Sequence, residues 1–374
     1  MNILIGSNVH WWNAEAAYAA VTARMLQEAG HRVYVLTRPC SENARRLRET
    51  GLTVITEPDL NSRNPAALLR SYFQLGHFLQ DRRIEIVNSH RSEGFPLFAL
   101  ARRSLDSFRL VRTRGASRRV VPHALNRKMH RDWMDAVIVP GEIIVKRDLK
   151  GIPIPPERLH VIYYPVDLPP DFPIEAERDY REEFNIPSGH RVLAAVGRIR
   201  PEKGHRLLLE AFQRFRKQFT EITLLILHRD TPSDHPGFRM VRKEVRDLGL
   251  ESSVRFDSER DDIRELMAFA DAGVISSIAS EVICRVAVEF FSVGTPLTVL
   301  PTGCLPEIVI EGHNGTLASH TSADSLCEAL LRLFKDSEAL KTMGMKARKD
   351  AETRFNPRLL LEKTLAVYQQ VLES

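Results

Sequence analysis

The sequence is poor in cysteine and contains no long apolar run. Its four cysteines, Cys40, Cys284, Cys304 and Cys327, are scattered without CxxC spacing or neighbouring histidines, which argues against a zinc site and a disulfide scaffold. No apolar segment approaches the roughly 18 residues of a membrane helix, and the first residues, MNILIGSN, lack the pattern of a signal peptide. We therefore expect reduced thiols and a cytoplasmic protein.

Other patterns are missing as well. The chain has no internal repeat, no low-complexity tract and no zinc-finger, helix-turn-helix or aromatic stacking module, which disfavours disordered, collagen-like and nucleic-acid-binding proteins. What is present is the composition of a soluble protein, with 43% hydrophobic and 27% charged residues in 374. This length exceeds one ordinary core and predicts two domains.

Positive charge is unevenly distributed, although the formal net charge is only +5. Residues 102–131 hold one carboxylate, Asp106, and a group of cations: Arg102, Arg103, Arg109, Arg112, Arg114, Arg118, Arg119, Arg127, Lys128 and Arg131. A solvated face, a nucleic-acid patch and a surface for an anionic membrane are the three alternatives, since clustered cations attract any polyanion. Without a nucleic-acid module, we expect no nucleic-acid partner.

The first half of the chain alternates short apolar strands with amphipathic helices. The predicted strands are 2–5, 31–36, 53–55, 84–88, 108–111 and 135–139, and helices are predicted at 14–29 and after Pro65. Strands that are apolar throughout are buried on both faces, which is typical of a parallel sheet between helical layers. The proline-rich interval 163–177 then predicts an interdomain linker.

The same alternation resumes after this interval. Strands are predicted at 192–196, 223–227, 254–256, 272–275 and 297–300, with a helix at about 203–218 and a last amphipathic helix that returns to the first domain. The predicted fold class is α/β, with two doubly wound domains that comprise 1–165 plus 357–374, and 166–356. Ligands of such domains bind beyond the carboxyl ends of the strands, so we expect a cleft there.

Two cations follow the first strand of the second domain. Gly197 permits an unusual backbone angle, Arg198 emerges at the carboxyl end of the strand, and Lys203 precedes the next helix. Arg198 and Lys203 can hold a diphosphate, the first through paired hydrogen bonds and the second as a point charge. The alternative is a pair of surface cations.

Two glutamates lie eight positions apart in SEVICRVAVEFFSVGTP, residues 280–296. Glu281 falls in a loop after the predicted strand 272–275, and Glu289 falls inside a helix predicted over 284–293. The N–H groups at a helix start suit phosphate or sugar oxygens, whereas carboxylates repel phosphate and accept hydrogen bonds from hydroxyl groups. The combination favours a nucleotide sugar as the ligand.

These segments carry a resemblance to a known family. VGRIRPEKGHRLLLEAF, IRELMAFADAGVISSIASE, the two glutamates, SVGTP and PTGCLPEIVIEGHNGTLA resemble, in order and spacing, the motifs of the family 4 (GT4) retaining glycosyltransferases with a GT-B fold. EAGHRVYVLT, IVNSH, HVIYYPVD and the closing NPRLLLEKTLAVYQQVL are similar to segments elsewhere in that family. The resemblance implies two Rossmann-like domains, of which the first binds the acceptor and the second binds the donor.

The resemblance also implies the roles of individual residues. The donor site would comprise Gly197, Arg198, Lys203, Glu281, Glu289, Cys304 and Leu305. Arg198 and Lys203 would bind the diphosphate, Glu289 the ribose and Glu281 the transferred sugar, while Cys304 and Leu305 would offer backbone amides. His90 would lie near the reacting centre, unless it is a structural histidine, and His90, Arg198, Lys203 and Glu281 are the candidate catalytic residues. The family uses no metal, and we expect no cofactor besides the nucleotide sugar.

Several positions depart from the family pattern. The glycine-rich first loop is replaced by SNVHWWNAEA. The family's EGFG-like element here ends in Cys284, and its paired glycines near Glu307 read Gly303 and Cys304. Tyr164 and Pro165 replace an NG pair, and His228, Arg229 and Asp230 stand where a glycine turn is usual. Side chains at glycine positions narrow a pocket and restrict the approach of the backbone to a ligand.

The acceptor is less well defined. Trp11, Trp12 and Asn13 follow the first strand and are candidate acceptor contacts together with His90, because indole faces stack on sugar rings; the alternative is that the tryptophans pack internally. We expect a glycan or lipid-linked acceptor, with residues 102–131 docked on the anionic inner face of the cytoplasmic membrane.

The expected function is retaining transfer of a sugar from a nucleoside diphosphate sugar to an acceptor hydroxyl, in the synthesis of a bacterial envelope glycan such as lipopolysaccharide or exopolysaccharide. One alternative is a nucleotide-sugar 2-epimerase of GT-B fold, which needs acid and base groups around the sugar C2. A second is a non-catalytic, degenerate transferase that binds a nucleotide sugar or a partner protein, and the glycine replacements favour it.

Overall fold

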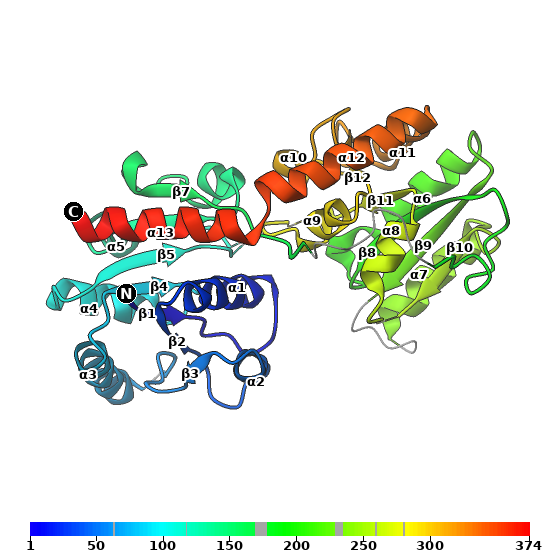
Figure 1. Cartoon of the computed structure of the whole chain (residues 1–374). Coiled ribbons are helices and arrows are strands. Elements are labelled where there is room, and N and C mark those ends of the chain that lie inside the picture. The colour runs from blue at the N-terminus through cyan, green and yellow to red at the C-terminus, as the bar shows by residue number, and fades with distance from the viewer. Residues whose placement is uncertain (63, 117, 169–177, 229–234, 259, 280) are drawn as a thin grey trace. The chain divides into compact units, whose positions relative to one another are not determined.

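The computed structural model describes residues 1–374 except 63, 117, 169–177, 229–234, 259 and 280 (Figure 1). The chain divides into two compact units, Met1–Tyr164 with Pro357–Ser374, and Pro165–Asn356. Most of the predicted linker 163–177 lies outside the described residues, as do Arg229 and Asp230 of the expected glycine turn.

The first unit is built on a parallel sheet of seven strands in the order β3-β2-β1-β4-β5-β6-β7. Its strands are β1 (Asn2–Gly6), β2 (Arg32–Leu36), β3 (Thr53–Ile55), β4 (Ile86–Ser89), β5 (Arg109–Thr113), β6 (Ala136–Val139) and β7 (Leu159–Val161). Strands β1, β4 and β6 are almost wholly buried, because helices cover both faces of the sheet.

The helices of the first unit begin where the sequence supplies capping residues. They are α1 (Ala14–Glu28), α2 (Glu42–Glu49), α3 (Pro65–Asp81), α4 (Phe95–Ser104), α5 (Ala124–Asp132) and α13 (Pro357–Glu373), with short η1 (Ile144–Asp148) and η2 (Pro156–Arg158). The side chains of Asn13, Ser41 and Asn64 each accept a hydrogen bond from the first turn of the helix that follows.

The last helix, α13, is attached to the first unit by buried polar contacts (Figure 1). Asn88 Nδ2 on β4 donates to the hydroxyl of Tyr368 at 2.7 Å, and Asn88 Oδ1 accepts from the hydroxyl of Thr113 at 2.9 Å. On β5, Arg109 Nε donates to the carbonyl of Val371 at 2.9 Å. The predicted return of this helix to the first domain is therefore observed, and specific hydrogen bonds fix its position.

The second unit is built on a parallel sheet of six strands in the order β10-β9-β8-β11-β12-β13. Its strands are β8 (Arg191–Gly197), β9 (Ile222–His228), β10 (Val254–Asp257), β11 (Ala272–Ile275), β12 (Leu297–Val299) and β13 (Gly315–Leu317). Its helices are η3 (Pro201–Lys203), α6 (His205–Arg216), α7 (Pro236–Asp247), α8 (Ile263–Phe269), α9 (Arg285–Ser292), α10 (Leu305–Ile308), α11 (Ala323–Phe334) and α12 (Ser337–Arg354).

The predicted fold class, α/β with two doubly wound domains, is confirmed. In both sheets the strand order reverses once, between β1 and β4 in the first unit and between β8 and β11 in the second. The loops after these neighbouring strands diverge to opposite faces of the sheet, which opens a crevice at their carboxyl ends where ligands of such folds bind. The topology thus selects one strand pair in each unit as the place to look for a site.

Candidate active site

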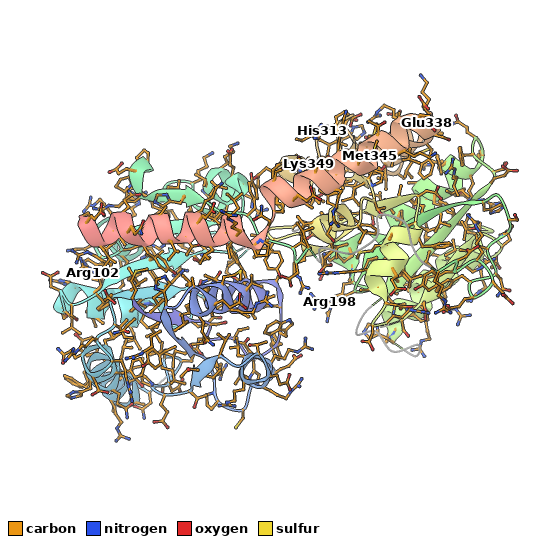
Figure 2. All side chains as sticks on the ribbon, viewed as in Figure 1. Arg102, Arg198, His313, Glu338, Met345 and Lys349 are labelled. Carbon is orange, nitrogen blue, oxygen red and sulfur yellow. The ribbon has the colours of Figure 1, made fainter. Side chains whose placement is uncertain are left out.

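In the second unit, the loops after β8 and β11 meet at the switch point of the sheet. Gly197 ends β8 with a φ of +154°, a value that side chains disfavour. Arg198 follows directly, is exposed, and lies at the edge of the unit in Figure 2. The structure therefore places Gly197 and Arg198 at the carboxyl end of the strand, as the sequence predicted.

The central contact of this site is an ion pair between Lys203 and Glu281. Lys203 Nζ, at the end of η3, donates to Glu281 Oε1, which lies in the loop after β11 and also accepts from the hydroxyl of Ser277 at 2.5 Å. Only 5% of Glu281 is exposed. Burial lowers the pKa of Lys203, but the neighbouring Glu281 carboxylate outweighs burial, so the pKa of Lys203 is raised and it stays charged.

A third segment, after β12, packs against this pair. The N–H of Cys304 donates to the carbonyl of Glu281 at 2.7 Å, and the N–H of Leu305 donates to the carbonyl of Thr302 at 3.2 Å. The backbone amides that were expected to contact the donor therefore already have acceptors within the chain, and a ligand would have to share or replace these bonds. The sequence could not reveal this, because the bonds depend on the path of the loop.

The two cysteines at glycine positions are buried beside the ion pair. Burial raises the pKa of the Cys304 thiol to about 12, and burial and the Glu281 carboxylate also raise the pKa of Cys284. Both thiols are therefore protonated at neutral pH, and neither is a nucleophile, since the thiolate is the reactive form. Their side chains fill space in the loops that hold Glu281.

Glu289 lies on α9, one turn beyond Arg285, with which it forms an ion pair at 2.9 Å. Helix α9 spans Arg285–Ser292, close to the predicted 284–293. Among the residues that the structure describes, no hydrogen bond or ion pair joins Glu289 or Arg198 to the Lys203–Glu281 pair. The structure thus brings together Lys203, Glu281 and Cys304, and leaves the other two side chains outside this contact.

In the first unit, His90 follows β4 at the switch point. Its side chain is buried, with 3% exposed, and packs edge-on against Tyr18 with ring centroids 5.6 Å apart. Burial lowers the pKa of His90 to about 3, so the imidazole is neutral at physiological pH. Its Nε2 has no hydrogen-bond partner in the described part of the chain. A neutral imidazole can accept or share a hydrogen bond, but it does not supply a positive charge.

The other candidate acceptor residues lie in the loop after β1. Trp11 is 66% exposed, whereas Trp12 is half-buried, with the Arg46 guanidinium 5.4 Å from its ring centroid. Asn13 caps α1 and accepts from the N–H of Ala16 at 2.9 Å. Trp11 packs edge-on against His10, with ring centroids 5.4 Å apart, but exposes most of its surface to a ligand, whereas Trp12 and Asn13 are held by their contacts with Arg46 and Ala16.

Sequence reasoning missed two polar contacts. Ser277 shares the Glu281 carboxylate with Lys203, and Arg91, directly after His90, pairs with Glu15 on α1 and with Glu93. Serine after a buried strand and a charged residue beside a strand-end histidine were the available signals. Their partners are distant in sequence, so the pairs themselves were not visible.

The basic stretch 102–131 does not form a uniform surface. Six of its cations are exposed, namely Arg103, Arg118, Arg119, Arg127, Lys128 and Arg131. Arg102 on α4 (Figure 2) is engaged by Asp135 at 2.9 Å, and Arg112 and Arg114 are buried. The prediction of one cationic face is therefore wrong for Arg112 and Arg114, because strand β5 lies within the basic run, and for Arg102, because Asp135 engages its side chain.

Two features are absent from the described residues. No group of three or more His, Cys, Asp or Glu side chains in them is arranged to hold a metal ion. Likewise, no helix within them combines the length and the apolar character needed to cross a membrane.

Comparison with sequence families gives two matches that together span most of the chain. The sequence model of the glycosyl transferases group 1 matches residues 176–350, and that of glycosyltransferase family 4 matches residues 16–169. A lipopolysaccharide 1,2-N-acetylglucosaminetransferase of Salmonella typhimurium is 29% identical over 163 residues, which cover 42% of this chain and 43% of that protein. The chain spans about half the length of the curated relatives that it matches.

Solved structures share the whole fold. A glycosyltransferase from Rickettsia africae has a TM-score of 0.86 at 18% identity and covers 100% of this chain and 99% of its own. Alr3699/HepE from Anabaena, solved in complex with UDP, has a TM-score of 0.83 at 18% identity and covers 99% and 100%. At this identity the likeness shows that the fold of this chain is the GT-B fold.

The contact between Gly303 and Glu281 generates a stability prediction. Gly303 has a φ of +59°, and a Cβ there would overlap the backbone of Glu281. Gly312 has a similar φ of +70° with no atom near the position of a Cβ. Gly312→Ala should therefore cost only the left-handed backbone, roughly 1–2 kcal/mol, whereas Gly303→Ala should cost about 1–3 kcal/mol more because of the overlap.

The free energy of unfolding, from urea titration followed by circular dichroism, measures the difference between the two variants. Gly312→Ala serves as the matched control for backbone strain. Equal losses in both variants would show that the loop after β12 does not pack against Glu281 in solution.

Proposed function

Because the chain belongs to the family 4 glycosyltransferases of the GT-B fold, we propose that it moves a sugar from a nucleoside diphosphate sugar to an acceptor hydroxyl, with retention of the anomeric configuration. The observation that carries the proposal is the buried Lys203–Glu281 pair at the strand ends of the second unit. A cation binds diphosphate and a carboxylate binds sugar hydroxyls, so the pair matches both parts of a nucleotide sugar.

The cations would act when the leaving group departs. Breaking the bond between the anomeric carbon and the phosphate oxygen places negative charge on the diphosphate, and Arg198 and Lys203 would stabilise that charge. One preorganised contact of this kind is worth roughly 3–4 kcal/mol. Lys203 is held in place by Glu281 before the donor arrives, so little reorganisation is required.

Retention can proceed without a protein nucleophile. The sugar develops positive charge as the phosphate leaves, and the acceptor oxygen forms its bond on the same face. The acceptor proton passes to an oxygen of the departing diphosphate. The nucleoside diphosphate is the second product. The protonated state of Cys284 and Cys304 is consistent with this scheme.

The carboxylates would fix the donor by its hydroxyl groups. Glu281 keeps one oxygen engaged with Lys203 and Ser277, so its other oxygen is available to a hydroxyl of the transferred sugar. Glu289 is half-buried on α9 and would accept from the ribose. We propose that the two cations replace a metal ion and that no cofactor besides the donor is required.

The first unit would bind the acceptor, through His90 and the exposed face of Trp11, with Trp12 and Asn13 shaping the loop. The name of the Salmonella relative supports an envelope glycan as the acceptor, and the UDP complex of the Anabaena protein makes UDP sugars the first donors to test. We propose a role in envelope glycan synthesis at the inner face of the cytoplasmic membrane.

The donor assignment predicts a selective thermal stabilisation. One compound among UDP, GDP, ADP, CMP and dTDP, together with their sugars, should raise the Tm, because a ligand that binds only the native state stabilises it. Glu289→Ala should lose most of this shift. Glu210→Ala is the matched control, since it removes a comparable ion pair, with Arg206 at 3.0 Å, from α6.

A shift that survives unchanged in Glu289→Ala would remove the ribose role of that residue. The absence of any shift across the whole set would argue that the chain binds no nucleotide sugar.

The six exposed cations of 102–131 predict binding to anionic lipid. Each basic residue near such a surface contributes about 1 kcal/mol, and the attraction weakens with salt. The protein should sediment with vesicles that contain phosphatidylglycerol and remain in the supernatant with neutral vesicles. Negligible binding to both kinds would remove the proposed membrane docking.

A further inference from the structure

Two arginines at the carboxyl end of β5 lie on one face of the sheet of the first unit. Arg112 and Arg114 are two positions apart, so their side chains leave the strand on the same side. Arg109 and Thr113 leave it on the opposite side, where they contact Val371 and Asn88. Arg112 and Arg114 are each only 4% exposed, which is rare for a charged residue. The carboxylates that act on them, Glu93 and Asp148, are already paired with Arg91 and Arg147.

Arg112 has few partners in this position. Its guanidinium stacks on Phe95, with the Cζ atom 4.0 Å from the ring centroid, and its NH2 group donates to the hydroxyl of Ser92 at 3.1 Å. Its Nε and NH1 groups are buried and have no acceptor among the described residues. The carboxylate that acts on it, Glu93, is already bound by two hydrogen bonds from Arg91, at 2.9 and 3.1 Å.

The side chains beside Arg112 also have buried nitrogen atoms without a hydrogen-bond partner among the described residues. Arg114 donates one hydrogen bond to the carbonyl of Arg118, and its buried Nε has no acceptor in the described chain. His130 on α5 packs against Phe95 with ring centroids 5.2 Å apart, and its Nε2 also lacks a partner there. Arg112 and His130 thus both pack on Phe95, the first residue of α4, and the charge of Arg114 acts on both of them.

The electrostatic balance of this cluster is positive. Burial and the nearby charge of Arg114 lower the pKa of Arg112 to about 9, which still leaves it charged at neutral pH. Burial, and then the charge of Arg112, lower the pKa of His130 to about 4. The start of α4 adds its positive end at the same place, since Gly94 provides no side-chain cap. Buried guanidinium donors without an acceptor are costly when the nearby carboxylates are paired with other arginines, so the arrangement fits a site that is completed by an anion.

The cluster lies next to His90, one of the candidate acceptor residues. Arg112 is the register partner of Ser89, which directly precedes His90. The two acceptors that the guanidinium groups now use, the Ser92 hydroxyl and the Arg118 carbonyl, belong to exposed residues. An anion from solvent can therefore replace these two bonds without entering the core.

We propose that Arg112 and Arg114 bind an oxyanion carried by the acceptor, and that this group is a phosphate monoester. Two guanidinium groups match the charge of a phosphate dianion, and the planar fork of arginine forms paired hydrogen bonds with its oxygens. The assignment to the acceptor rests on the proposed function, whereas the anion site itself does not. A phosphorylated sugar and the headgroup of phosphatidic acid both present a phosphate monoester.

A purely structural role of Arg112 makes opposite predictions. If the stack on Phe95 and the bond to Ser92 exist to hold the loop, Arg112→Met should lower the Tm and leave anion binding unchanged. If the site is built for an anion, removal of an unpaired buried charge should leave the Tm of the ligand-free protein unchanged or raised, because a buried ion is often replaced by an apolar side chain without loss.

Calorimetric titration of the full chain with inorganic phosphate, at constant ionic strength, tests the site. The parent protein carries Arg198→Ala and Lys203→Ala, so that the donor site cannot bind the phosphate. Arg112→Met in this parent should weaken phosphate binding roughly tenfold or more, and Arg112→Lys should bind with intermediate affinity. Arg70→Met, at an exposed arginine of α3 in the same unit, is the matched control and should bind like the parent.

Phosphate affinity within twofold of the parent in Arg112→Met, or a clear loss of Tm without phosphate, would overturn the proposal. If Arg112→Met does not fold, Arg112→Lys decides by its affinity alone. A phosphomonosaccharide and short-chain phosphatidic acid then compete separately with phosphate, which distinguishes a sugar phosphate from a lipid headgroup. Donor binding is measured independently, by thermal stabilisation. A failure of the donor assignment therefore leaves the phosphate site standing, and a failure of the phosphate site leaves the donor assignment standing.

Discussion

The ion pair between Lys203 and Glu281 is the interaction on which the site of the second unit depends. It joins the turn after β8 to the loop after β11, 78 residues apart in the chain. Two glycines allow the segments to approach: a Cβ on Gly204 would overlap the carbonyl of Ser276, and one on Gly303 would overlap Glu281. The hydroxyl of Ser276 also donates to the carbonyl of Lys203 at 2.9 Å. A buried ion pair stabilises a fold weakly, but it fixes geometry well when further hydrogen bonds hold it, as the Ser277 hydroxyl does for Glu281 Oε1.

The buried charges of the first unit are less completely paired than those of the second. In the second unit each buried ion of the site has a partner, and the strand ends are drawn together by that pairing. In the first unit Arg112 and Arg114 are held at the strand end by a stack and two hydrogen bonds. Within the described part of the chain, Nε and NH1 of Arg112 and Nε of Arg114 have no acceptor. In the proposed function, the first arrangement preorganises the donor site, and the second leaves positive charge available to the acceptor.

The sequence predicted the architecture because buried parallel strands are apolar on both faces and therefore stand out. The three-residue strands β7 and β13 were missed since LHV and GTL form no apolar run, and the polar helix ENARRLRE of α2 has too few apolar residues to reveal its period. Residue positions at strand ends were also predictable, as Arg198 and His90 illustrate. The contacts between site residues were not predictable, because only the fold brings Lys203 and Glu281 together.

In the basic stretch, a count of charges alone did not predict which arginines are buried. A run of arginines looks solvated when only charge is counted, although FRLVRTR continues the period-two pattern of a buried strand through Arg112 to Arg114. That period distinguishes the two buried arginines from the six exposed cations.

Release of nucleoside diphosphate from UDP, GDP and ADP sugars is the most direct test of the central claim that the Lys203–Glu281 site performs transfer. A transferase hydrolyses its donor slowly when no acceptor is present, so the wild-type chain should release one nucleotide over hours. Lys203→Ala should slow that release by about a hundred- to a thousandfold, while Lys346→Ala, at an exposed lysine of α12, should not. Unchanged release in Lys203→Ala, or no release by the wild type from any of these donors with or without glycan acceptors, would contradict the account.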